Sequence, residues 1–90
     1  MRIGLKLRGT DALGNPFEEV SSTQNVSAEG FLCECSAPLA IGAVLDVFLV
    51  SGNTRFIGKA RVIRQHESGG SSLSYAFRLV EKNSDWILQT

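Results

Sequence analysis

The sequence has no surplus of charge of either sign. Nine Lys and Arg residues balance nine Asp and Glu residues, so the formal net charge at neutral pH is zero. Proteins dedicated to nucleic acids or anionic membranes depend on an excess of positive charge, and the composition disfavours both classes. The chain also lacks any apolar run near the roughly 18 residues of a membrane-spanning helix. Its first residues alternate in polarity, unlike the continuous apolar stretch of a signal peptide.

Cysteine and histidine are scarce. Cys33 and Cys35 are the two cysteines of the chain, and His66 is its one histidine. A disulfide framework needs more cysteines at wider spacing, and a zinc site needs more Cys or His ligands than these. We therefore expect both thiols to be reduced and buried on one face of a strand. Two reduced cysteines are typical of a cytoplasmic protein, which is the location we expect.

The sequence offers little that points to catalysis. His66 lies in a polar, glycine-rich stretch, where we expect it to be exposed in a hairpin turn without a positioned nucleophile. Glu18 and Glu19 are adjacent, but neighbouring residues of a strand point to opposite faces and form no carboxylate pair. Carboxylates from separate strands could still converge. No glycine-rich triphosphate loop is present. We expect no enzymatic activity, no cofactor and no metal.

What the chain does have is 43% hydrophobic residues in alternating patterns. Its 90 residues suffice for a single domain, over 1–90, with its own core. Short stretches with the alternation or the apolar enrichment of strands are separated by turns rich in Gly, Asn and Ser. The expected strands are about 3–8, 17–25, 31–35, 44–50, 55–65 and 73–80.

Regular short strands without intervening helices predict an all-β fold. We expect a six-stranded antiparallel barrel, because closure removes the exposed edges of so small a sheet. A short C-terminal helix is expected at about 84–88, with Asn83 or Ser84 as its N-cap. Trp86 of this helix should cover one end or side of the barrel. The expected core residues on the inward faces are Leu5, Leu7, Leu45, Val47, Leu49 and Val62.

Simple alternation divides the strand expected over 55–65 into two faces. Phe56 should face the core together with Ala60 and Val62, and the opposite face should carry the basic residues Arg55, Lys59 and Arg61. Such a basic row supports an alternative function as a small nucleic-acid-binding barrel. The neutral net charge and the shortage of aromatic residues free to stack on bases disfavour that alternative.

The most informative segment is the loop that carries Asn25, Ser27 and Gly30. An Asn and a Ser two residues apart can bond either to the backbone or to a ligand. Gly30 permits a left-handed conformation or a close approach of two backbones. The residues alone leave two interpretations open: an ordinary turn held by side-chain-to-backbone bonds, or a ligand-binding loop.

This loop and its surroundings resemble the PilZ domain family, whose motif is (Asp/Asn)-x-Ser-x-x-Gly. Residues 36–39, Ser-Ala-Pro-Leu, are similar to the family's Ser-x-Pro-Leu corner. Residues 75–79, Tyr-Ala-Phe-Arg-Leu, resemble its closing Tyr-Gly-Phe-Arg-Phe strand. The resemblance extends over almost the whole chain, from Ile3 to about Val80.

The resemblance implies a bacterial receptor domain for cyclic di-GMP, with Asn25, Ser27 and Gly30 holding the nucleotide. The family completes its site with an Arg-x-x-x-Arg clamp before the first strand, since a guanidinium fork matches guanine edges and phosphates bidentately. That clamp does not occur in this sequence. Arg2 and Arg8 are candidates for auxiliary basic contacts, although neither stands at the clamp's place.

The missing clamp leaves two explanations: it lies upstream of Met1 in a longer protein, or this domain has diverged and lost it. We expect a cyclic di-GMP-binding regulatory domain that signals to a neighbouring domain or a downstream protein. The alternative is a PilZ-like protein-interaction module that binds no nucleotide. Neither a nucleic acid nor a membrane is expected as a partner.

Overall fold

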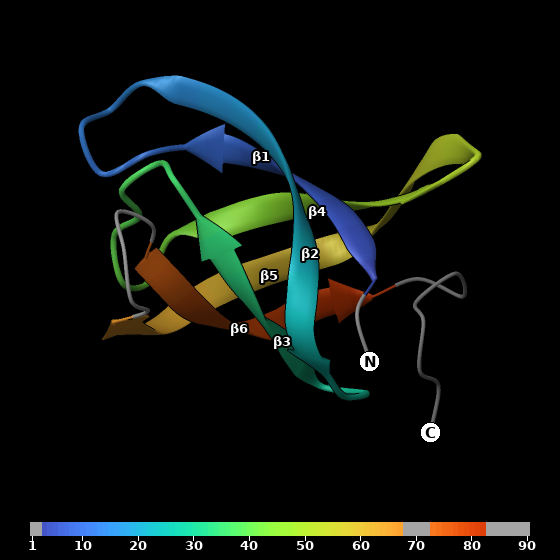
Figure 1. Cartoon of the computed structure of the whole chain (residues 1–90). Helices are drawn as coiled ribbons and strands as arrows, with labels where there is room; N and C mark the ends of the chain where they lie inside the picture. The colour runs from blue at the N-terminus through green and yellow to red at the C-terminus, as the bar shows by residue number, and fades with distance from the viewer. Residues whose placement is uncertain (1–2, 68–72, 83–90) are drawn as a thin grey trace.

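A computed structural model of the protein describes residues 3–67 and 73–82. Six strands lie within these residues: β1 (Gly4–Thr10), β2 (Pro16–Val26), β3 (Gly30–Cys35), β4 (Val44–Ser51), β5 (Asn53–Glu67) and β6 (Leu73–Lys82). All pairings are antiparallel, and the strands close into a barrel in the order β1-β2-β3-β6-β5-β4 (Figure 1). The predicted six-stranded antiparallel barrel is confirmed, and each strand end lies within two residues of its expected place.

The part of the chain that the structure describes contains no helix. It therefore also contains no helix long and apolar enough to cross a membrane. The helix expected at 84–88, and with it Trp86, falls outside the described residues.

The barrel interior is filled by the inward-facing residues of all six strands. Five of the expected core residues are at most 1% exposed: Leu5, Leu7, Leu45, Val47 and Val62. Leu49 is only partly buried, because it is the last residue of β4 that pairs with β1 and lies where the barrel ends. Cys33 and Cys35 are buried and unbonded to each other, as predicted.

β5 departs from simple alternation around Gly58, where its pairing with β4 shifts by one residue. A Cβ at Gly58 would collide with the carbonyl oxygen of Glu81 in β6, so the close approach requires glycine. Such a bulge moves the preceding residues to the opposite face of the strand. Ile57 is consequently fully buried, whereas Phe56 is 38% exposed. The prediction that Phe56 belongs to the core is therefore wrong.

The same bulge divides the basic row expected on β5. Arg55 pairs with Leu49, which packs against the core, whereas Lys59 and Arg61 lie on the outer face. Directly paired residues share one face of a sheet, so Arg55 does not continue the line of the other two. The continuous basic row that favoured a nucleic-acid-binding barrel is therefore not formed.

The adjacent acidic residues of β2 point to opposite sides, as alternation predicts. Glu18 forms an exposed ion pair with Lys6 at 3.2 Å. The Glu19 carboxylate instead accepts hydrogen bonds from the Ser36 backbone N–H at 2.9 Å, the Ser36 hydroxyl at 3.0 Å and the Cys35 thiol at 3.4 Å. Partial burial alone would raise the pKa of Glu19, but these hydrogen bonds outweigh it and lower that pKa below its ordinary value. Glu19 thereby ties β2 to the corner that follows β3.

Candidate functional site

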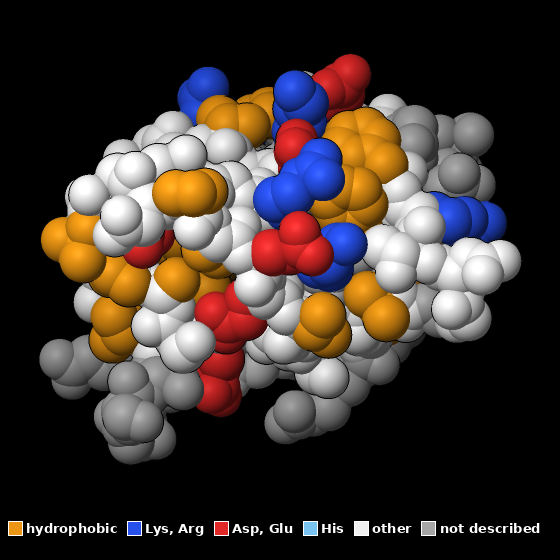
Figure 2. Space-filling view, turned by 90° about the horizontal axis from the view of Figure 1, so that it is seen from above, with side chains coloured by type: hydrophobic (Ala, Val, Ile, Leu, Met, Phe, Trp, Pro, Cys, Tyr) orange, Lys and Arg blue, Asp and Glu red, His pale blue; other side chains and the backbone are white. Residues whose placement is uncertain are grey.

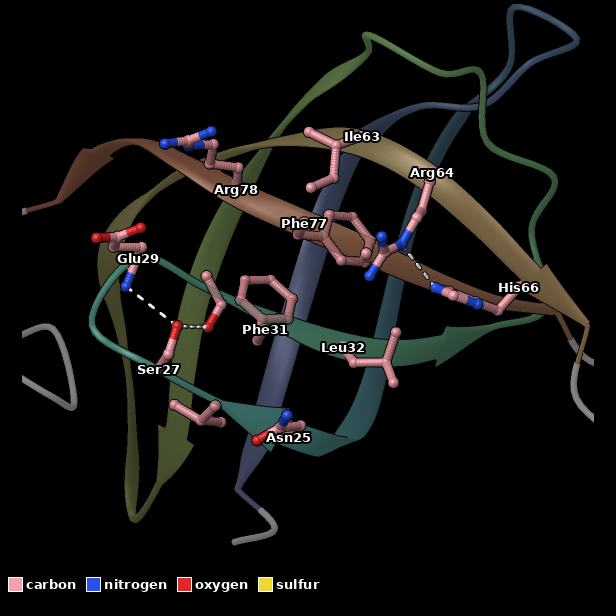
Figure 3. A pocket seen from close by; sticks show the side chains of 13 residues that line it. Asn25, Ser27, Glu29, Phe31, Leu32, Ile63, Arg64, His66, Phe77 and Arg78 are labelled. Atoms are coloured by element: carbon pink, nitrogen blue, oxygen red, sulfur yellow. Dashed lines mark hydrogen bonds between the residues drawn. The ribbon is translucent and has the colours of Figure 1, made fainter.

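A groove with a volume of about 430 Å³ opens on the barrel wall (Figure 3). Residues of β2, β3, β5, β6 and the β2–β3 loop line it. The structure brings Asn25, Ser27 and Gly30 to this one groove. Behind its surface, the rings of Phe31 and Phe77 stack with their centres 4.7 Å apart. The candidate loop therefore borders a groove whose base is formed by two stacked aromatic rings.

The strand registers arrange the groove in rows that run across the sheet. Asn25 of β2 pairs with Leu32 of β3. Leu32 pairs with Ala76 of β6, which in turn pairs with Arg64 of β5. Because paired residues share a face, one row has an amide at one side, a guanidinium at the other and an apolar surface between them. Leu32 and Ala76 therefore separate the two polar groups of this row.

Ser27 is engaged within its own turn. Its backbone N–H donates to the Gly30 carbonyl oxygen at 2.9 Å, and its hydroxyl donates to the same oxygen at 3.4 Å. The hydroxyl also accepts the Glu29 backbone N–H at 3.3 Å. These bonds match the interpretation of the loop as a turn. Asn25 differs from Ser27. Its side chain faces the groove, and its amide has no hydrogen-bond partner among the described residues.

Gly30 is needed for packing against β6. A Cβ at this position would collide with the carbonyl oxygen of Phe77. Gly30 does not adopt a positive φ, so the close approach of two backbones, and not a left-handed conformation, explains the residue. The glycine of the motif thus lets β3 and β6 approach closely at the groove.

Sequence reasoning missed the basic residues of the groove, Arg64, His66 and Arg78. The Arg64 Nε donates to the His66 Nε2 at 2.8 Å (Figure 3). His66 is exposed, as predicted, but it lies within β5 and not in a turn, because that strand continues to Glu67. The i, i+2 spacing was the signal that could have placed Arg64 and His66 on one face.

Arg78 lies at the other end of the groove, near Ser27 and Glu29 (Figure 3). Its neighbour across the β5–β6 pair is Arg61, which is also exposed. In residues 3–67 and 73–82, neither guanidinium forms an ion pair with a carboxylate. Arg78 thus has a second arginine beside it, just outside the lining of the groove, while Glu29 lines the same end without forming an ion pair with it.

The auxiliary candidate Arg8 lies elsewhere on the barrel. It projects from the outer face of β1 and donates to the Asp46 carboxylate at 3.2 Å. Its guanidinium carbon also lies 4.8 Å from the centre of the Phe48 ring. Arg8 does not line the groove. Arg2, the other candidate, is outside the described residues.

The two cysteines offer no reactive thiolate. Burial raises the pKa of the Cys33 thiol and raises that of Cys35 to about 12. A thiol with so high a pKa stays protonated near neutral pH and is a weak nucleophile and a weak metal ligand. Within the described residues, no group of three or more His, Cys, Asp or Glu side chains could hold a metal ion.

Comparison of the chain with family models, with curated proteins and with solved structures found no match. The resemblance to the PilZ family therefore stays a hypothesis based on the loop motif and the order of strands and turns.

Proposed function

We propose that this barrel is a regulatory domain that binds cyclic di-GMP in the groove over β2, β3, β6 and β5. One observation carries the proposal: the three residues singled out from the sequence as a nucleotide-binding loop all line the same groove. Its volume of about 430 Å³ falls within the range of roughly 300–1,000 Å³ that is usual for small-molecule sites. Resemblance and geometry thus point to the same surface.

The chemistry of the groove suits a nucleotide with guanine bases. Leu32 and Ala76 offer an apolar surface for a base. The Asn25 amide has both a donor and an acceptor for a base edge. Arg64 and Arg78 offer guanidinium groups, which pair bidentately with phosphate oxygens or with the O6 and N7 atoms of guanine.

We propose binding without turnover. The Ser27 hydroxyl is turned toward its own loop, and His66 accepts a hydrogen bond from Arg64, so these two side chains form no nucleophile–base pair in the described groove. Capture of the ligand would alter a surface that a neighbouring domain or a downstream protein reads. The buried, unbonded cysteines support a cytoplasmic location.

Calorimetric titration of the chain with cyclic di-GMP, at low ionic strength, tests the proposal. Asn25→Ala should weaken binding by about 1–3 kcal/mol, since a polar group of the ligand loses its partner. Asn53→Ala is the matched control, because Asn53 is an exposed asparagine at the start of β5 that does not line the groove. Absence of binding at millimolar ligand, or equal losses in both variants, would overturn the proposal.

The second candidate is a protein-interaction module that binds no nucleotide. Exposed apolar side chains can serve as contact points for another protein. Ile63 in the groove and Val44 are each 44% exposed, and Phe56 is 38% exposed. This function becomes the better one if the titration with cyclic di-GMP shows no binding.

A further inference from the structure

Six of the eight basic residues in the described strands differ clearly in their carboxylate partners. Three of them have a carboxylate within 4.0 Å: Lys6 with Glu18, and both Arg8 and Lys59 with Asp46. Three arginines on the outer face of β5 and β6 have none in residues 3–67 and 73–82: Arg61, Arg64 and Arg78. The chain is neutral as a whole, yet Arg64 and Arg78 bring positive charge to the groove, whose lining also includes Glu29. Arg61 lies beside the groove, and Lys82 donates to the Ala28 carbonyl oxygen.

The arrangement of Arg61 and Arg78 is unfavourable unless an anion joins it. The two residues are directly paired across β5 and β6, and both are exposed. Like charges directly opposite each other destabilise a sheet. An anion that binds between or beside the two guanidinium groups reduces that repulsion, and this relief favours binding of the anion.

His66 holds Arg64 in a state suited to phosphate. The bond at 2.8 Å uses the Nε–H of Arg64. Both terminal nitrogens of the guanidinium keep their N–H groups for a ligand, and two parallel bonds to one phosphate are the strong form of such a contact. Figure 3 shows the Arg64 guanidinium and the His66 ring at the same end of the groove. His66 is therefore a positioning residue for Arg64.

The residues paired with the two arginines are small. Gly30 and Ala76 have no long side chain that would hold a phosphate away from the sheet, and the Ile63 side chain lies between the two arginines (Figure 3). Arg78 is paired with Gly30, and Arg64 with Ala76, so the two guanidinium groups stand in successive rows. A ligand with two phosphate groups can engage both.

We infer that Arg64 and Arg78, supported by Arg61 and His66, form the phosphate-binding side of the groove. This inference rests on the proposed function and adds the residues that contact the anionic part of the ligand. The positive charge is supplied by β5 and β6 of the barrel itself. The ligand class that these residues take is an organic phosphate with two negatively charged phosphate groups.

The test is calorimetric titration of the chain with cyclic di-GMP and, separately, with inorganic pyrophosphate at low ionic strength. Arg64→Gln and Arg78→Gln should each lower the affinity for both ligands about 10- to 100-fold, since each removes charge-assisted hydrogen bonds. Lys59→Gln is the matched control, because it removes one charge from the outer face of β5 outside the groove. It should change either affinity less than about 3-fold, as a screened charge at a distance does.

The role of His66 has its own readout. His66→Leu should weaken pyrophosphate binding, because Arg64 loses the acceptor that orients it. His66→Gln should restore most of the binding, since the glutamine side-chain oxygen can accept the same N–H. Equal losses in the two His66 variants would contradict a positioning role, and circular dichroism melting of each variant checks that the barrel is intact.

The outcomes separate this inference from the proposed function. Cyclic di-GMP binding that depends on Asn25 but not on Arg64 or Arg78 overturns the inference and keeps the function. Pyrophosphate binding that depends on the two arginines, without any binding of cyclic di-GMP, keeps the inference and overturns the proposed function. Loss in Lys59→Gln as large as in the arginine variants, or no binding of either ligand, overturns the inference.

Discussion

Two faces of the same barrel differ in whether their basic side chains have carboxylate partners. On the face formed by β1 and β4, basic side chains meet carboxylates, and Lys6 and Arg8 also lie over the Phe48 ring at 4.9 and 4.8 Å. Figure 2 shows Lys and Arg side chains interleaved with Asp and Glu on the upper side of the barrel, next to apolar side chains. At the groove over β5 and β6, Arg64 and Arg78 have no carboxylate partner among the described residues.

A net charge of zero for the whole chain therefore says little about the charge of any one surface. On the β1–β4 face, two carboxylates, Glu18 and Asp46, lie within 4.0 Å of three basic side chains and offset most of their charge. The groove keeps its positive charge available, and a preformed guanidinium group pairs strongly with an anion. What matters for binding is where the partners of each charge lie, which only the fold decides.

The largest expected effect is on the β3–β6 contact beneath the groove. Gly30→Val should lower the free energy of unfolding by about 2–3 kcal/mol, because a side chain there collides with the β6 backbone. Gly4→Ala is the control, since a Cβ at Gly4 would make an ordinary contact at 3.5 Å with the Val50 carbonyl oxygen. Urea unfolding followed by circular dichroism measures both. Equal stabilities would show that the two strands separate without cost.

A smaller effect distinguishes the two neighbouring carboxylates of β2. Glu19→Gln should lower the free energy of unfolding by about 1 kcal/mol more than Glu18→Gln, because Glu19 accepts several hydrogen bonds and Glu18 has one exposed ion pair. Urea unfolding at neutral pH measures the difference. Similar values for the two variants would mean that the corner after β3 does not depend on Glu19.

The same residue predicts how stability changes with pH. The pKa of Glu19 is lower in the folded protein than its ordinary value of 4.5, so folding favours the ionised form. Its contribution is complete above that ordinary value and is lost as the pH falls through the folded pKa. The wild-type protein should therefore lose stability below about pH 4.5, and Glu19→Gln should lose less. Parallel pH profiles would contradict this account of Glu19.

The smallest expected effect is on the β1–β4 face. Arg8→Gln removes one exposed ion pair with Asp46 and should lower the free energy of unfolding by at most about 0.5 kcal/mol. Because Arg8 does not line the groove, the affinity for cyclic di-GMP should change less than about 3-fold. Calorimetry and urea unfolding of one variant measure both quantities. A loss of affinity as large as that of Arg64→Gln would make the two faces equivalent.

Alternation alone predicts most of the barrel from the sequence. Leu5, Leu7 and Val47 are core residues because each strand has one apolar face, and the structure buries them fully. The rule fails at Phe56 and Ile57, where the bulge at Gly58 reverses the faces. Gly58 inside a strand is a local sign of such a bulge, but which side chains it moves to the other face depends on the pairing with β4 and β6.

The candidate site divides in the same way. Asn25 and Ser27 belong to one local motif, so the sequence alone singles them out. Arg64 and Arg78 come from different strands, and they share a groove with Asn25 only because the register of β2, β3, β6 and β5 brings them together. Arg8 is the basic residue nearest in the sequence to the loop that carries Asn25. In the fold it lies on the β1–β4 face, beside Asp46 and away from the groove.

The most direct test of the central claim is to map cyclic di-GMP on both faces at once. Amide resonances of the protein, followed by NMR during titration with cyclic di-GMP, should shift at Asn25, Ser27 and Ala76. The amides of Asp46 and Phe48 on the β1–β4 face should stay unchanged. Shifts centred on that second face, or no shifts at millimolar ligand, would contradict a nucleotide-binding groove over β2, β3, β6 and β5.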